Sequence, residues 1–321
     1  MGADGDAMGG SVTPTATLGS LIRSGAAAVV RYTGTLLTVF LAQSILAIAT
    51  MIAIAVVLAH VFSHLPLWDD AVDGDLVALI ACLRFASANV LACSGIALAA
   101  ILLWQFASWF LIGGIYGVLA YRPEGRTETA RCFGACGAST YLAFIRVTLC
   151  SLPNWFAVAL LFAVSFNAAG VRFENALTLS DLIVPLAISI APTAGLAHLL
   201  STVADYTRAD LILRPDHQHN VLTSYARSFL FVLKSPLTLL HSGLGWLGFA
   251  VITAGYGYLA SGHPMFGTGG AIALFVIRQG VALARMAIRF GVLAGQLELL
   301  RARSPRRADS QPANGARGQA R

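Results

Sequence analysis

Six long apolar runs alternate with shorter polar segments along the 321 residues of the chain. A helix needs about 20 mainly apolar residues to cross the hydrocarbon core of a bilayer, and each run is long enough. The pattern therefore predicts an all-α, polytopic membrane protein with six transmembrane helices. The six runs cover residues 35–61, 90–119, 141–167, 182–204, 229–260 and 270–292.

Two features refine this prediction. The stretch 75–85 has only eight apolar residues before Arg84, too few to cross a membrane, so we interpret it as an interfacial or buried helix. Pro153, Pro185 and Pro192 lie inside predicted spans. Neighbouring helices can satisfy the carbonyls that proline frees, so we expect kinks at these positions rather than breaks.

Composition supports a lipid-facing surface. Charged residues make up 11% of the chain and hydrophobic residues 57%, and the mean hydropathy is +0.74. Soluble domains carry roughly a quarter charged residues. The lipid bilayer is therefore the first expected partner, and a further membrane protein could be another.

The net charge of +6 does not indicate a nucleic-acid partner. Six of the 21 basic residues fall in the last 21 positions, where aromatic side chains that could stack on bases are absent. A basic tail of this kind can instead contact anionic lipid headgroups. We expect disordered segments at 1–20 and 304–321 and one membrane domain at 21–303.

The distribution of basic residues predicts the orientation of the spans. Short loops rich in arginine and lysine stay in the cytoplasm. If both termini lie inside, Arg84 and Arg172 are the only basic residues in the outside loops. Twenty arginines against one lysine and an excess of alanine are typical of a high-GC bacterial genome, which places the protein in a bacterial inner membrane.

A loose repeat indicates three hairpins of similar layout. The stretches 28–37, 143–152 and 231–240 each carry one basic residue at the fourth place and lead into an outward span; these residues are Arg31, Arg146 and Lys234. Each returning span closes near an arginine followed by proline, and the repeats measure 91, 68 and 69 residues. We interpret the three basic residues as headgroup anchors whose charges reach the membrane surface. The alternative is a plain positive-inside flank.

Short, weakly charged stretches precede three of the spans. "GSLIRSGAAAVVRY", "ARCFGACGASTYLAF" and "NVLTSYARSFLFVL" are moderately apolar and rich in small residues. They predict short interfacial helices on the cytoplasmic face, each running into its span.

Charged residues inside spans are the candidate functional groups, because a charge near the centre of a helix costs about 3 kcal/mol on insertion. Arg278, Arg285, Arg289 and Gln296 fall close to one line on the last helix. His198, Thr202 and Asp205 share a face of the fourth helix.

Two interpretations of these residues stay open. In the first, Asp205 pairs with Arg285 or Arg289, and Arg278 faces a polar cavity that holds an anionic substrate or lipid headgroup. In the second, the lower arginines are cytoplasmic and Asp205 caps a salt-bridged helix end.

Other candidate chemistry is weaker, and we expect no catalytic residue, metal or cofactor. His60 and His64 stand beside Asp69, Asp70, Asp73 and Asp75, which suits zinc, but a solvated acidic loop is the simpler interpretation. The five cysteines show no disulfide framework, and Cys132 and Cys136 are interpreted as small buried thiols. Glycine-rich stretches at 242–248 and around Gly113 permit close helix packing.

The stretches "FLIGGIYGVLAYRPEG", "ADYTRADLIL" and "RSFLFVLKSP" resemble uncharacterised bacterial six-helix membrane proteins. These are similar in layout to the membrane domain found beside some glycerophosphodiester phosphodiesterases. The resemblance covers residues 20–305 and implies the same membrane fold, but no phosphodiesterase activity, because the catalytic domain is absent.

The sequence favours a non-enzymatic membrane protein that binds or translocates a small or lipidic molecule, which could be anionic. A scaffold or assembly subunit for a partner protein is the second possibility. A membrane-embedded enzyme is the third, since it would need polar groups clustered at one depth.

Overall fold

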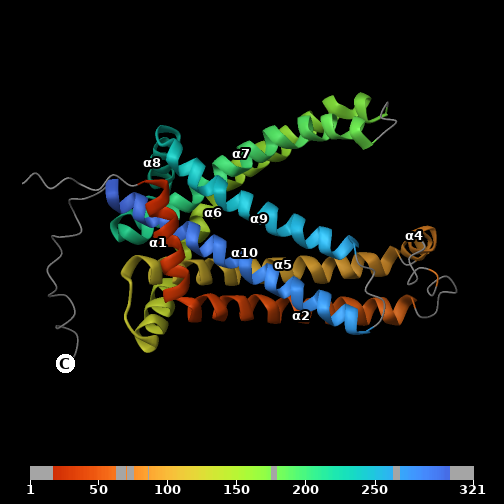
Figure 1. Cartoon of the computed structure of the whole chain (residues 1–321), viewed down its shortest axis with the longest axis horizontal. Helices are drawn as coiled ribbons and strands as arrows, with labels where there is room; N and C mark the ends of the chain where they lie inside the picture. Colours follow the sequence, from red (N-terminus) through yellow and green to blue (C-terminus); the bar gives the residue numbers. More distant parts are fainter. Residues whose placement is uncertain are drawn as a thin grey trace, which may run out of the picture. The chain divides into compact units, whose positions relative to one another are not determined.

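The structure is a computed structural model that describes residues 17–62, 70, 76–85, 87–174, 179–262 and 268–303. Every regular element within these ranges is helical, which confirms the all-α prediction (Figure 1). The elements are α1 (Leu18–Arg31), α2 (Thr33–Phe62), α4 (Leu76–Phe85), α5 (Ser87–Tyr121), α6 (Arg126–Glu174), α7 (Leu179–Leu213), the 3₁₀ helix η1 (Pro215–His219), α8 (Val221–Lys234), α9 (Pro236–Gly262) and α10 (Thr268–Arg303).

Among the residues that the structure describes, five helices are long and apolar enough to cross a membrane: α2, α5, α6, α7 and α9. In their most apolar stretches only 6% to 22% of the residues are buried inside the protein. Large side chains such as Ile45, Phe156 and Val251 are therefore exposed along them. Such continuous apolar surface suits lipid and not water. The chain is a multi-pass membrane protein.

The last helix, α10, is also long, at 36 residues, but it is not among these five. Arg278, Arg285 and Arg289 interrupt its apolar sequence. Length alone would allow it to cross a bilayer, since 36 residues at 1.5 Å each extend about 54 Å.

The predicted run 229–260 is divided between two helices. Its first residues belong to α8, which ends at Lys234, and α9 starts at Pro236. Proline lacks the N–H that a helix interior needs, and its ring suits the first helical position. The run 141–167, by contrast, continues without a break from the preceding stretch, and both lie in α6.

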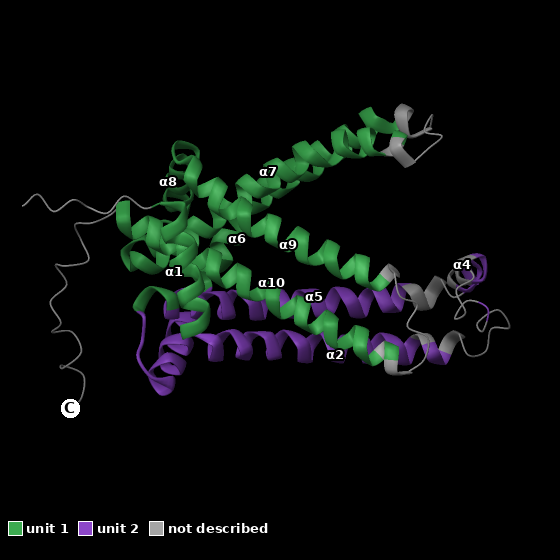
Figure 2. Ribbon diagram, in the orientation of Figure 1, with its two compact units in different colours: residues 1–31, 119–121, 142–321 green, residues 32–118, 122–141 purple. Residues whose placement is uncertain are grey.

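The described helices divide into two compact units (Figure 2). Unit 1 comprises residues 1–31, 119–121 and 142–321. Unit 2 comprises residues 32–118 and 122–141. The single domain expected over 21–303 stays a prediction.

Within unit 1, small residues bring helices into close contact with α10. A Cβ atom on Gly25 of α1 would lie 2.6 Å from the backbone oxygen of Gly291. Gly245 and Gly248 of α9 face Val292 and Ile288. Small residues at such spacing let helix backbones approach closely. The stretch 242–248 thus serves packing.

A hydrophobic core fills the region of unit 1 where α1, α7, α8 and α10 converge. Its fully buried members are Leu21, Val203, Tyr206, Val232 and Leu299, with exposed fractions of 1% or less. This core fixes the buried faces of the two short helices α1 and α8, whose opposite faces stay exposed.

Within unit 2, the first part of α6 packs on three glycines of α5. A Cβ atom on Gly113 would meet the hydroxyl of Thr140 at 2.5 Å. Gly114 faces the ring of Phe133, and Gly117 faces Cys136. As in the contact of α1 with α10, a short helical stretch that comes before a predicted span packs on glycines of another helix.

The burial pattern recurs in the three stretches that the sequence aligned. Arg31, Arg146 and Lys234 are all exposed. The residue after each one is buried in all three cases: Tyr32, Val147 and Ser235. The residue six positions before each one is small and buried: Gly25, Thr140 and Ser228.

The short helices α1 and α8 extend this similarity. Both have 14 residues, both end on the basic residue, and a single residue separates each from a long apolar helix. At Arg31 and Lys234 the sequence repeat therefore corresponds to a repeated local structure, whereas α6 continues through Arg146 without a break.

Substitution of Gly25 tests the contact between α1 and α10. Gly25→Ala should lower the stability by about 1–3 kcal/mol, because its Cβ meets backbone rather than a movable side chain. Gly19→Ala in the same helix is the matched control, since nothing lies within 4 Å of the added atom. It should be neutral or stabilising by up to about 1 kcal/mol. Thermal unfolding in detergent measures both, and equal effects of the two changes would contradict the contact.

Candidate functional site

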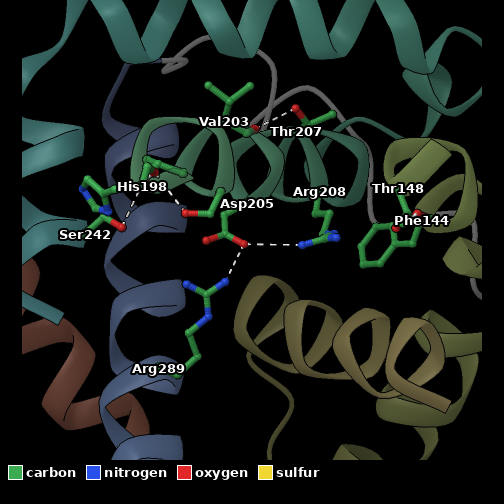
Figure 3. Close-up of polar contacts among 11 residues, drawn as sticks. Phe144, Thr148, His198, Val203, Asp205, Thr207, Arg208, Ser242 and Arg289 are labelled. Atoms are coloured by element: carbon green, nitrogen blue, oxygen red, sulfur yellow. Dashed lines mark hydrogen bonds and ion pairs between the residues drawn. The ribbon is translucent and has the colours of Figure 1, made fainter. Parts of the chain in front are cut away.

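A buried carboxylate on α7 is the centre of the candidate site. The side chain of Asp205 is 2% exposed, and its Oδ1 atom accepts a hydrogen bond from Nη2 of Arg289 at 2.6 Å. Nη1 of Arg208 approaches the same oxygen at 3.5 Å. Figure 3 shows the two guanidinium groups reaching the carboxylate from α10 and from the next turn of α7. Two cations around one anion give the cluster a formal charge of +1.

This pair holds α7 against α10 within unit 1. A buried charge loses its hydration, and a partner charge with good geometry must offset that loss. Arg289 supplies this partner from another helix, whereas Arg208 comes from the same helix and also lies over the ring of Phe144 at 6.0 Å. Of the two partners expected for Asp205, the structure therefore selects Arg289.

The other arginines of α10 have different surroundings. The guanidinium of Arg285 lies over the ring of Phe249 at 5.6 Å, and Arg278 is exposed. Gln296 lies at the buried end of the same stripe, with an exposed fraction of 0%. Along this line of side chains on α10, the exposure thus falls from an exposed Arg278 to a fully buried Gln296. The polar cavity expected at Arg278 stays a prediction.

His198 and Thr202 face α9 instead of α10. Nε2 of His198 donates to the backbone carbonyl of Leu239 at 3.2 Å, and its ring meets the edge of Trp246. The hydroxyl of Thr202 lies 3.2 Å from that of Ser242 and 2.8 Å from the carbonyl of His198. The face that carries His198, Thr202 and Asp205 is therefore shared between two neighbouring helices.

Buried polar side chains gather on the same helices. Tyr206 and Gln296 are 0% exposed, and His241 is 4% exposed. Within the described residues, the Tyr206 hydroxyl, the Gln296 amide and Nδ1 of His241 have no hydrogen-bond partner. His241 also lies against Gly295 of α10, whose added Cβ would meet its ring at 2.5 Å. Unit 1 thus has a polar layer inside an apolar exterior.

Arginines at the end of α10 join the ends of other helices. Nη2 of Arg301 donates to the backbone carbonyls of Leu119 and Ala120, which belong to the same unit. Nη1 of Arg303 donates to the hydroxyl of Ser235, between α8 and α9. Basic side chains commonly satisfy the last carbonyls of helices in this way. These two residues therefore have a structural use.

A polar contact also fixes α8 on α6. Nδ2 of Asn154 donates to the hydroxyl of Tyr225 at 2.9 Å. Burial raises the pKa of the Tyr225 phenol, so the group stays neutral at physiological pH.

Sequence reasoning missed several of these partners. Arg208 lies in the stretch "ADYTRADLIL", three residues after Asp205, and this spacing could have indicated the pair. The sequence indicates only a packing role for the stretch that contains Ser242, and it indicates no role for Tyr206. No periodicity signals which residue on another helix faces a given hydroxyl.

The described residues hold no group of three or more His, Cys, Asp or Glu side chains that could bind a metal. Of the expected outer-face set, His60 and Asp70 lie within these residues, whereas His64, Asp69, Asp73 and Asp75 fall outside them. The headgroup role of Arg31, Arg146 and Lys234 stays a prediction, although all three are exposed.

No family model, curated protein or solved structure matches the chain. The class of the protein therefore follows from its own residues: a multi-pass membrane protein with a buried ion pair between two helices. Chemically, the site joins α7 to α10 through a carboxylate that two guanidinium groups approach.

A double-mutant cycle tests the ion pair. Asp205→Leu or Arg289→Leu alone should lower the stability by about 3–5 kcal/mol, since each leaves a charge without its partner. The double variant should recover most of this loss. Chemical unfolding in detergent measures the three variants, with Arg285→Leu as the matched control on α10. Additive losses in the double variant would show that the two residues do not interact.

Proposed function

We propose that the protein has six spans arranged as three hairpins: α2 with α5, α6 with α7, and α9 with α10. In this arrangement α1, the first part of α6, and α8 are interfacial helices that precede the outward spans. Both termini face the cytoplasm of a bacterial inner membrane. The repeated burial pattern around Arg31, Arg146 and Lys234 supports this arrangement. The proposed arrangement has the same layout as the membrane domain found beside some glycerophosphodiester phosphodiesterases.

The proposed function is non-enzymatic: the protein binds, and could translocate, an anionic amphiphile at the arginine-bearing face of α10. The observation that carries the proposal is the exposure of Arg278 and Arg285 on a face whose third arginine, Arg289, is held by buried Asp205. The ion pair fixes the rotation of α10 about its axis. The side chains of Arg278 and Arg285 therefore leave α10 on a fixed side of the helix.

The surroundings of Arg278 suit a lipid-like ligand. Ile272, Phe275 and Val276 are 59%, 46% and 61% exposed on the preceding turns of α10. An acyl chain can lie along these side chains while its anionic headgroup contacts the guanidinium. Arginine is suited to this contact because its planar group donates two parallel hydrogen bonds to a phosphate or carboxylate.

The scaffold alternative is less favoured. It needs a glycine-rich face open to a partner protein. Gly113 and Gly117 pack on α6 inside unit 2, and Gly245 and Gly248 pack on α10 inside unit 1. These glycine-rich stretches are therefore already covered by other helices of the same unit.

Lipid binding by the purified protein tests the proposal. In native mass spectrometry from mild detergent, the protein should bind phosphatidylglycerol in preference to phosphatidylcholine. Arg278→Gln combined with Arg285→Gln should weaken this binding about 30-fold, for two headgroup charges at about 1 kcal/mol each. Lysine at both positions should keep the preference for the anionic lipid but bind it more weakly, because the charge remains while the paired hydrogen bonds of the guanidinium are lost.

The control variant is Arg131→Gln, which removes an exposed arginine from α6. It should leave the preference unchanged. Equal binding of the two lipids by the unaltered protein, or undiminished preference in the double glutamine variant, would contradict the proposal.

A further inference from the structure

Two thiols lie side by side in the first part of α6. Cys132 and Cys136 are four residues apart on one face of the helix, and their sulfur atoms are 4.0 Å from each other. Both are free cysteines with partly exposed side chains. Solvent can therefore reach the pair.

Contacts with α5 hold the pair in place. A Cβ atom on Gly117 would lie 2.3 Å from Cβ and 2.5 Å from Sγ of Cys136, so only glycine leaves room for this thiol. Phe133 and Thr140 make similar contacts with Gly114 and Gly113, one turn to either side. The helical segment that carries both cysteines is thus packed along its length, and the spacing of the sulfurs is fixed before any ligand binds.

We propose that Cys132 and Cys136 form a two-coordinate site for a soft monovalent cation, Cu(I). Thiolates are soft ligands that suit Cu(I), zinc and iron–sulfur clusters, and the number of ligands distinguishes among these. With metal–sulfur bonds of about 2.3 Å, as thiolates make to zinc, one ion can bridge sulfurs 4.0 Å apart. A preorganised pair needs little rearrangement to bind.

The surroundings favour two ligands over four. Structural zinc sites need four ligands, and the described residues offer no third His, Cys, Asp or Glu that completes a cluster here. Glu128 lies one turn before Cys132, but its carboxylate accepts a hydrogen bond from the Glu124 backbone and is a poor ligand for a soft ion. A two-coordinate ion fits the residues present.

Binding requires no electron transfer. Each thiol loses its proton to solvent, two Cu–S bonds form, and the ion stays Cu(I). The bis-thiolate product carries one negative charge. The site consists of unit 2 residues and shares none with the proposed lipid site, whose residues belong to unit 1, so this inference stands or fails separately from the proposed function.

A competition titration tests the site on the purified, full-length protein without oxygen. Cu(I) is supplied as its complex with the chromogenic chelator bathocuproine disulfonate, and the loss of colour reports transfer. The protein should remove one Cu(I) per chain. Cys132→Ser should abolish the transfer, because a single thiol competes poorly with a bidentate chelator.

The matched control is Cys150→Ser, which changes a thiol of the same helix outside the pair. It should leave the transfer unchanged. Retention of Cu(I) by Cys132→Ser, or an equal loss in Cys150→Ser, would overturn the proposal, since either result would assign the ion to other thiols. Zinc supplied under matched competition should not be retained, and zinc held more tightly than Cu(I) would also overturn the two-coordinate assignment.

A second variant separates loss of the site from loss of the fold. The atom of Cys132 nearest to a Cβ atom on Gly117 is its backbone carbonyl oxygen, at 3.7 Å, and not its sulfur. Cys132→Ser should therefore unfold at the same temperature as the parent. Gly117→Ala keeps both thiols but displaces Cys136, and it should weaken Cu(I) retention while thiol titration still counts five cysteines. Undiminished retention in Gly117→Ala would show that the fixed spacing is not needed.

Discussion

The contact between Asp205 and Arg289 constrains the other polar features of unit 1. A carboxylate that is 2% exposed requires a charged partner, and that partner comes from a different helix. The pair therefore sets both the position of α10 along α7 and its rotation. That rotation places Gln296 inside the unit and leaves Arg285 and Arg278 exposed. It also turns Gly291 toward α1, and Gly295 toward α1 and α9, so that these helices can approach α10 closely. One ion pair thus connects the polar layer, the glycine packing and the arginine-bearing face.

Glycine stripes provide the second constraint, because helices in lipid gain little from the hydrophobic effect and associate through close packing. Gly113 and Gly117 of α5 meet Thr140 and Cys136 of α6. Gly291 and Gly295 of α10 meet Gly25 and the backbone of Leu21 in α1. Thr140 and Gly25 occupy the same place relative to Arg146 and Arg31. The same kind of close contact therefore occurs in two parts of the chain.

The sequence was sufficient for the helical class, the positions of the long helices and the short helix at 75–85. It offered Arg285 or Arg289 as a partner of Asp205 in one of two open interpretations. These follow from hydropathy and from helical spacing, which are local properties. The division at Ser235 was missed although Pro236 signals it, because the apolar run continues across the break. The contacts of Thr202 with Ser242 and of Cys136 with Gly117 could not be predicted. Periodicity shows which residues share a face, but the neighbouring helix that covers this face is decided by tertiary packing.

The central claim is that α10 crosses the membrane with its ion pair to α7 inside the protein, although three arginines interrupt its sequence. Accessibility of its two ends tests this most directly. In a chain whose five cysteines are replaced by serine, single cysteines are placed at Thr268 and Ala302 and treated in intact cells with a membrane-impermeant maleimide. The account predicts that Thr268→Cys reacts at once and that Ala302→Cys reacts only after the membrane is permeabilised. Reaction of both positions from the same side would contradict it.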